Sequence, residues 1–254
     1  MENAMPRFFL DREFEYAPDA PLPESIVLDG EDAFHLSVSL RARIGDEVEV
    51  CSANGVEFLF SIASISGGKK DPVVVIHPFF AKKSESEMPV EVTLFQGMPK
   101  GKKTDSIIQK CTELGVSRIV FVYTDHAVPE LADEEKKLAR FRKIAEEACK
   151  QCGRGKLVKI DLLPSLESAL DQMTESDVAF ACYELEQEGG LKGILRRPFV
   201  SASFFVGPEG GISQRELALL QEKKIPTVTL GKRILRTETA GSSVMSMILY
   251  EKEL

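Results

Sequence analysis

Two segments near the C-terminus combine glycine, basic and acidic residues in an order that suits ligand binding. Residues 206–212 contain three glycines and Pro208 directly after an apolar run, which describes a rigid turn where a ligand can approach bare backbone. Residues 230–243 contain basic residues and Glu238, followed by a run of small residues. Both segments follow expected strands, and open α/β sheets bind ligands at the carboxyl ends of their strands. A tight structural turn and an ordinary surface loop are the alternative interpretations.

A third loop, residues 97–104, resembles a phosphate-binding loop but has the wrong spacing. Three residues separate Gly97 from Gly101, where the P-loop pattern requires four, and two lysines follow. The spacing therefore disfavours a nucleotide hydrolase. Lys100, Lys102 and Lys103 would still lie at a helix N-terminus, where backbone N–H groups and the helix dipole favour anions such as RNA phosphates.

The charge distribution leaves nucleic-acid binding open. The net charge of −8 argues against a surface that is basic throughout, but nine Lys or Arg residues and only two Glu residues lie between Lys136 and Lys159. This stretch is either the solvated face of a helix or a phosphate-contacting surface.

Composition also indicates where the protein is located and whether it binds a metal. The five cysteines are scattered and are expected to be reduced thiols, and Cys149 and Cys152 lack the further ligands that a structural zinc site needs, so we expect no metal. No apolar run approaches the ~20 residues that span a bilayer, and the charged N-terminus does not look like a secretory signal. We expect a cytoplasmic protein without a membrane segment.

Residues 1–80 are expected to form a small β-barrel, because short apolar or alternating runs are separated by turn residues. One helix is expected at residues 31–40, and a linker at residues 82–87 ends at Pro89. The expected strands are residues 7–10, 25–28, 47–51, 56–63 and 73–79.

Residues 90–254 are expected to form an α/β domain, because apolar strands alternate with amphipathic helices as in a parallel sheet. Thr104 is placed to cap a helix that ends at Gly115, Ser213 and Glu216 have the spacing of a capping box, and residues 239–252 should form the last helix. The expected strands are residues 90–96, 117–123, 157–163, 177–183, 201–206 and 227–230.

The order of these motifs resembles the SPOUT class of knotted methyltransferases, and within it the family that methylates N3 of a uridine in 16S ribosomal RNA. Each motif is weak alone, but together they cover nearly the whole chain in order. The matching segments are residues 5–9, 35–41, 100–102, 108–115, 147–154, 206–211 and 230–240.

The resemblance implies a PUA-like RNA-binding β-barrel followed by a domain whose backbone forms a trefoil knot, which ordinary topology rules would not predict. It also implies a homodimer that acts on 16S rRNA or the small ribosomal subunit, with S-adenosylmethionine as cofactor. The cofactor-binding residues that it implies are Val206, Gly207, Pro208, Glu209, Gly210, Gly211, Ile212, Leu230, Gly231, Ile234, Leu235, Arg236, Thr239 and Ala240.

Methylation of uracil N3 requires loss of a weakly acidic proton, so the enzyme must assist that loss or stabilise the resulting anion. Arg236 is suited to stabilising charge on the uracil oxygens, and Glu238 to accepting the proton or orienting Arg236. Alternatively, the pair only braces the backbone. The residues expected to contact RNA are Arg7, Arg41, Arg43, Lys100, Lys102, Arg154 and Lys156. A catalytically inactive RNA-binding or ribosome-assembly factor with the same fold is the competing hypothesis.

Overall fold

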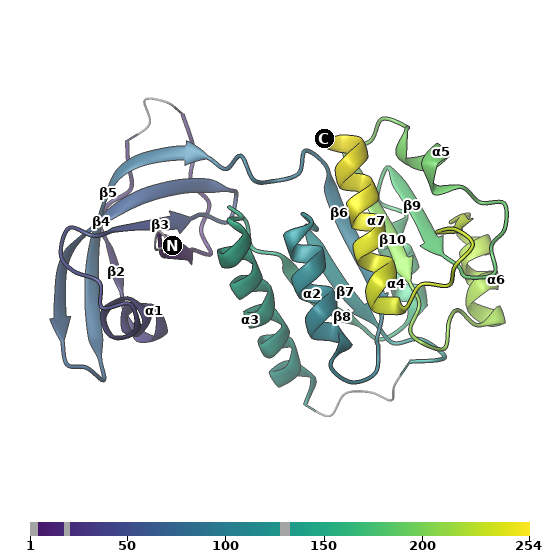
Figure 1. The fold of residues 1–254 in the computed structure, drawn as a ribbon, viewed down its shortest axis with the longest axis horizontal. Coiled ribbons are helices and arrows are strands. Elements are labelled where there is room, and N and C mark those ends of the chain that lie inside the picture. Colours follow the sequence, from purple (N-terminus) through teal and green to yellow (C-terminus); the bar gives the residue numbers. More distant parts are fainter. Residues whose placement is uncertain (1–4, 18–20, 128–132) are drawn as a thin grey trace. The chain divides into compact units, whose positions relative to one another are not determined.

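The computed structural model describes residues 5–17, 21–127 and 133–254. The chain divides into two compact units, which are considered separately (Figure 1). Unit 1 comprises Met1–Glu87 together with Lys150–Leu157, and unit 2 comprises Met88–Cys149 together with Val158–Leu254. A short segment from the middle of the chain therefore belongs to the N-terminal unit.

Unit 1 is built on a five-stranded mixed sheet with the order β1-β3-β4-β5-β2. Strands β1 and β3 pair in parallel and the other pairs are antiparallel. Among the described residues the outer strands β1 and β2 do not pair with each other, so the sheet is open. The strands are β1 (Arg7–Phe9), β2 (Ile26–Leu28), β3 (Glu47–Cys51), β4 (Val56–Gly67) and β5 (Pro72–Lys83).

The core of unit 1 explains the alternation in its sequence. Phe58, Phe60 and Ile62 on β4 and Val74 and Ile76 on β5 point to one face, where all are buried. The expected helix at residues 31–40 is present in two parts, α1 (Gly30–Phe34) and a π-helical turn η1 (His35–Ser39), which pack on this core. The expected linker is not a free spacer, because β5 runs to Lys83 and residues 84–87 are hydrogen-bonded to unit 1.

Unit 2 contains the expected parallel sheet, with the strand order β11-β9-β10-β6-β7-β8. Each expected strand is present, within two residues at either end. The strands are β6 (Glu91–Gly97), β7 (Arg118–Val122), β8 (Lys159–Leu163), β9 (Val178–Cys182), β10 (Ser201–Val206) and β11 (Thr227–Val228). Strand β11 is shorter than expected because Thr229 and Gly231 form a tight turn, in which Gly231 has a φ of +111°.

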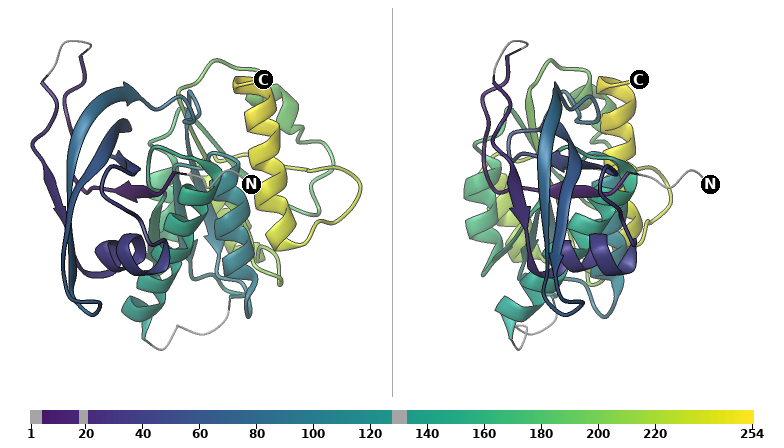
Figure 2. Two further views of the ribbon diagram at one scale, coloured as in Figure 1. Left: turned by 60° about the vertical axis from the view of Figure 1, so that its left-hand side comes forward. Right: turned by 90° about the vertical axis from the view of Figure 1, so that its left-hand side faces the viewer.

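Helices cover both faces of this sheet. The helices α2 and α7 lie side by side in all views (Figures 1 and 2). On the other face, α4 and α6 bury Leu170 and Leu220 against Phe95, Val120 and Phe205 of the sheet. The helices are α2 (Lys103–Glu113), α3 (Glu134–Cys152), α4 (Leu166–Met173), α5 (Leu191–Leu195), α6 (Gln214–Glu222) and α7 (Thr237–Lys252).

The helix termini confirm two local expectations and correct two others. Ser213 and Glu216 form the capping box of α6, and Gly115 follows α2 with a φ of +89°. Thr104 is not the cap of α2, since the helix begins earlier with Lys102 at the N-cap and Thr104 buried inside it. Helix α7 starts at Thr237 rather than at residue 239, because the Thr237 hydroxyl is anchored to neighbouring segments.

No helix among the described residues is long and apolar enough to cross a membrane.

Candidate functional site

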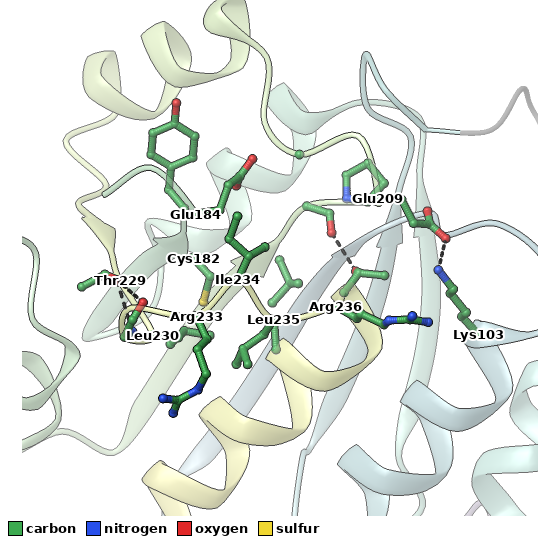
Figure 3. A pocket seen from close by; sticks show the side chains of 18 residues that line it. Lys103, Cys182, Glu184, Glu209, Thr229, Leu230, Arg233, Ile234, Leu235 and Arg236 are labelled. Atoms are coloured by element: carbon green, nitrogen blue, oxygen red, sulfur yellow. Dashed lines mark hydrogen bonds and ion pairs between the residues drawn. The ribbon is translucent and has the colours of Figure 1, made fainter. Parts of the chain in front are cut away.

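A pocket of about 430 Å³ opens at the carboxyl ends of β9, β10 and β11 in unit 2 (Figure 3). This volume lies within the roughly 300–1,000 Å³ that is typical of small-molecule sites. Its walls come from the ends of these strands, from the loops that follow β10 and β11, and from α2 and α7. The lining residues are Lys103, Cys182, Tyr183, Glu184, Val206, Gly207, Pro208, Glu209, Gly211, Thr229, Leu230, Gly231, Arg233, Ile234, Leu235, Arg236, Thr237 and Ala240.

The two segments singled out in the sequence therefore meet in one pocket, although about twenty residues separate them in the chain. Of the residues expected to bind a cofactor, Gly210, Ile212 and Thr239 do not line it. Ile212 is buried in the hydrophobic core, and Gly210 lies against the His126 ring. Arg236 lines the pocket, whereas Glu238 does not. The expected residues that do line it are Val206, Gly207, Pro208, Glu209, Gly211, Leu230, Gly231, Ile234, Leu235, Arg236 and Ala240.

The turn after β10 is closely packed, and side chains would not fit at its glycines. The N–H of Gly211 donates to the carbonyl of Pro208 at 3.0 Å, which closes the turn. Gly211 has a φ of +70°, and a Cβ there would lie 2.3 Å from Oε1 of Glu184. A Cβ on Gly97 at the end of β6 would lie 2.5 Å from the Pro208 ring. At Gly97 the backbone therefore packs directly on the backbone of residues 207 and 208.

A buried hydrogen-bond network joins this turn to the start of α7. Gln96, which is fully buried, donates from Nε2 to Oγ1 of Thr237 at 2.8 Å and to the carbonyl of Val206 at 3.3 Å. The Thr237 hydroxyl in turn donates to the carbonyl of Gly207 at 2.7 Å. Sequence reasoning missed both residues, although an amide at the end of the apolar strand β6 was a usable signal.

Charged side chains gather at one side of the pocket. Nζ of Lys103 lies 2.7 Å from Oε1 of Glu209 and 3.7 Å from Oε2 of Glu238. The hydrogen bond with Glu209 raises the pKa of Lys103. Burial pushes the pKa of Glu209 upward, but hydrogen bonds from Lys103 and from the N–H of Lys100 outweigh it and the pKa is lowered. Both groups are therefore charged at neutral pH.

The opposite wall of the pocket contains an unreactive thiol. Burial raises the pKa of Cys182 to about 12, so the thiol stays protonated and acts as a small apolar side chain. Among the described residues no group of His, Cys, Asp and Glu side chains could hold a metal ion.

Comparison with known proteins identifies the domain that contains this pocket. The model of the RNA methyltransferase domain family matches residues 86–249. The ribosomal RNA small subunit methyltransferase E of Bacillus subtilis (strain 168) is 31% identical over 258 residues, covering 98% of each chain. The chain belongs to this methyltransferase family. The resemblance found in the sequence is thus confirmed at the level of the family.

Solved structures of other proteins share the fold. A crystal structure described only as that of a hypothetical protein is 31% identical, with a TM-score of 0.84 over 97% of this chain and 98% of the other. Ribosomal RNA small subunit methyltransferase E from Neisseria gonorrhoeae, solved bound to S-adenosyl methionine, is 28% identical, with a TM-score of 0.79 over 97% of both chains.

Two arginines that the sequence suggested as RNA contacts lie inside unit 1. The guanidinium group of Arg7 pairs with Glu49 at 2.6 Å and Glu57 at 3.2 Å, and also donates to the carbonyl of Arg154 at 2.6 Å. Arg154 is 4% exposed and pairs with Glu87 at 2.6 Å. These ion pairs hold residues 150–157 to unit 1, where Arg154 is buried and the Arg7 side chain is 12% exposed, so both guanidinium groups are engaged within the protein. Their role as RNA contacts stays a prediction.

The other suggested RNA contacts are accessible. Arg41 and Arg43 are exposed on unit 1, as are Lys100 and Lys102 beside the start of α2 in unit 2. Lys156 is half-buried, with its methylene groups against Gly55.

Proposed function

We propose that this protein is an S-adenosylmethionine-dependent methyltransferase that methylates N3 of a specific uridine in the 16S rRNA of the small ribosomal subunit. One observation carries the proposal: the loops after β10 and β11 meet in a single pocket inside the domain that matches the RNA methyltransferase family. The Neisseria gonorrhoeae family member, which has the same fold, binds S-adenosyl methionine. An inactive assembly factor with this fold would have no need of such a pocket.

The residues present fit this cofactor. Leu230, Ile234 and Leu235 supply apolar wall for an adenine ring, and the glycine turn exposes backbone that can hydrogen-bond to it. The carboxylate of Glu184 also lines the pocket and offers a partner for the positive charges of the ligand, whereas the carboxylate of Glu209 is paired with Lys103. We assign to cofactor binding the expected residues that line the pocket, together with Cys182, Glu184 and Thr229.

The proposed reaction needs orientation and charge stabilisation from the protein. Uracil N3 loses its proton to solvent and forms a bond to the methyl carbon that the cofactor supplies, while the electron pair of the broken C–S bond stays on sulfur. Negative charge develops on the uracil oxygens as the proton leaves. Arg236 lines the pocket with an exposed guanidinium group, and we assign to it the stabilisation of this charge (Figure 3). Glu238 belongs to the same charged cluster.

We also propose that the N-terminal unit is a PUA-like RNA-binding domain within residues 1–80 and that the backbone of residues 90–254 forms a trefoil knot, as in the SPOUT class. The exposed Arg41, Arg43, Lys100 and Lys102, with Lys156, are the proposed RNA contacts. A cytoplasmic location follows from a ribosomal substrate.

A homodimer is the proposed assembly. Tyr250 and Met247 on α7 are 72% and 39% exposed, and Ile234 at the pocket rim is 77% exposed. Met247 and Tyr250 lie three positions apart and therefore on one face of α7, and an exposed apolar face of this kind favours association with a second subunit.

The decisive experiment is methyl transfer from labelled S-adenosylmethionine to small ribosomal subunits from cells that lack this protein. We expect label on N3 of one uridine in 16S rRNA. Label on a ribose or on no nucleotide would contradict the proposal, and RNA binding without cofactor binding would favour the assembly factor.

A further inference from the structure

Lys103 contributes a positive charge to the pocket from α2, a helix that lies outside both loops proposed to bind the cofactor. It is the first residue of α2, and its side chain lines the pocket while staying 31% exposed. Figure 3 shows its ammonium group beside Glu209 and on the same side of the pocket as the guanidinium group of Arg236. The sequence placed Lys103 in an anion-binding loop, not in the catalytic pocket.

Glu238 does not line the pocket itself but forms an ion pair with Lys103, which does. Its carboxylate oxygen Oε2 is buried without a hydrogen bond, 3.7 Å from Nζ of Lys103. An ionised carboxylate in this position acts mainly as an electrostatic partner of the nearby ammonium group. In this geometry Glu238 is therefore placed to orient a cation and is not placed to contact a substrate.

Glu209 fixes the ammonium group from the other side. Its Oε1 lies 2.7 Å from Nζ and also accepts from the N–H of Lys100, so the carboxylate is itself held in place. An ammonium group has three N–H donors. One hydrogen bond runs to Glu209 and the contact with Glu238 is an ion pair, so the ammonium group keeps donor capacity for a ligand in the pocket.

We propose that Lys103 is a second catalytic residue, which donates a hydrogen bond to a uracil oxygen and stabilises the negative charge that develops when N3 loses its proton. Glu209 and Glu238 are its positioning residues. The proposal rests on the proposed function and extends it, because it assigns Glu238, which the sequence suggested as a proton acceptor or a partner of Arg236, to support of the lysine.

The electrostatic surroundings agree with a charged lysine. The groups that face it are Glu209 from the loop after β10, Glu238 from α7 and Arg236 at the N-cap of α7. Repulsion from Arg236 is outweighed by the hydrogen bond and the attraction to the two carboxylates, and the pKa of Lys103 is raised. A lysine whose pKa is raised stays protonated at neutral pH, so it is suited to stabilising an anion and not to acting as a general base.

The test compares Lys103→Met, which keeps most of the side-chain stem but removes the charge, with Lys103→Arg, which keeps the charge. Lys110→Ala is the matched control, since it removes an exposed lysine from the same helix. We expect Lys103→Met to lower kcat for N3 methylation by about 100-fold, as for loss of one charge-stabilising donor, with unchanged S-adenosylmethionine affinity. Lys103→Arg should recover part of this loss, and Lys110→Ala should behave like the wild type.

The pH profile separates an electrostatic role from a structural one. If Lys103 assists loss of the N3 proton, the activity of Lys103→Met should rise steeply with pH as solvent hydroxide takes over, and its deficit should narrow. Glu238→Gln should lower kcat in the wild type but have little effect in the Lys103→Met background.

Wild-type kcat in Lys103→Met, a parallel loss of cofactor affinity, or a deficit independent of pH would each overturn the proposal for Lys103. Failure of the wild-type protein to label N3 is a different result, which would overturn the proposed function itself.

Discussion

Nε2 of Gln96 donates to Oγ1 of Thr237 at 2.8 Å, and this hydrogen bond ties the central strand β6 to the first residue of the last helix. The two residues are 141 positions apart in the chain. Through the carbonyl groups of Val206 and Gly207 the same network holds the turn after β10. The start of α7 and one wall of the pocket are therefore positioned by a single buried amide.

Replacing the Thr237 hydroxyl should weaken both the fold and cofactor binding. Thr237→Val keeps the shape but leaves Nε2 of Gln96 without its best acceptor, so we expect a loss of about 1–3 kcal/mol in the free energy of unfolding. Thr237→Ser retains the hydroxyl and should lose less. Urea denaturation and cofactor titration measure the two effects, and equal behaviour of the two variants would show that the hydroxyl is unimportant.

Gly211→Ala should impair the pocket without a general loss of folding. Its φ of +70° disfavours a Cβ, and the added carbon would meet Oε1 of Glu184 at 2.3 Å. We expect weaker S-adenosylmethionine binding in calorimetry. The control is Gly193→Ala, because a Cβ there meets nothing within 4 Å. Unchanged affinity in Gly211→Ala would show that the turn adapts without cost.

Substitutions of Arg154 and Arg41 should affect different properties: the first should lower stability, and the second should weaken RNA binding. Arg154→Met leaves Glu87 without its ion-pair partner in unit 1, and breaking such a buried pair costs about 3–5 kcal/mol. Arg41→Ala should barely alter stability but should weaken rRNA binding and reduce its salt dependence by about one unit in the log–log slope. A selective loss of RNA affinity in Arg154→Met, with normal stability, would contradict the structural role.

The stability contributed by Asp125 should disappear only in strong acid. Hydrogen bonds from Arg215 and Ser213 lower the pKa of Asp125 from 3.8 to about 2. A carboxylate with a depressed pKa stabilises the fold above its unfolded pKa, and this contribution is lost as the pH falls from about 4 to about 2. The pair is largely exposed, so the gain at neutral pH should be about 1 kcal/mol or less.

Asp125→Asn measures this contribution directly. The difference in unfolding free energy between the wild type and the variant should be constant from pH 7 to about pH 5 and should then shrink toward pH 2. A difference that grows in acid would contradict the assigned pKa direction.

Local patterns in the sequence were sufficient for much of the fold. The apolar run of β10 and the capping box of Ser213 and Glu216 depend on residues close in the chain, and both were predicted where they occur. The two pocket segments were found because glycine and charged residues mark strand ends even in a single sequence.

The burial of individual charges was not available from these patterns. Arg7 and Arg154 looked like surface cations, yet their carboxylate partners Glu49, Glu57 and Glu87 lie on other segments of the chain. Nothing near an arginine in sequence indicates whether such a partner is brought to it by the fold.

The sequence by itself determined the order of strands and helices along the chain, the family, and the two loops that form the pocket. These follow from periodicity, turn residues and the order of the motifs. Only the tertiary structure showed that Gln96 holds the pocket wall in place, that Lys103 lines the pocket and that Glu238 forms an ion pair with this lysine. Those relationships depend on side chains brought within hydrogen-bonding or ion-pairing distance by packing of segments up to 141 residues apart.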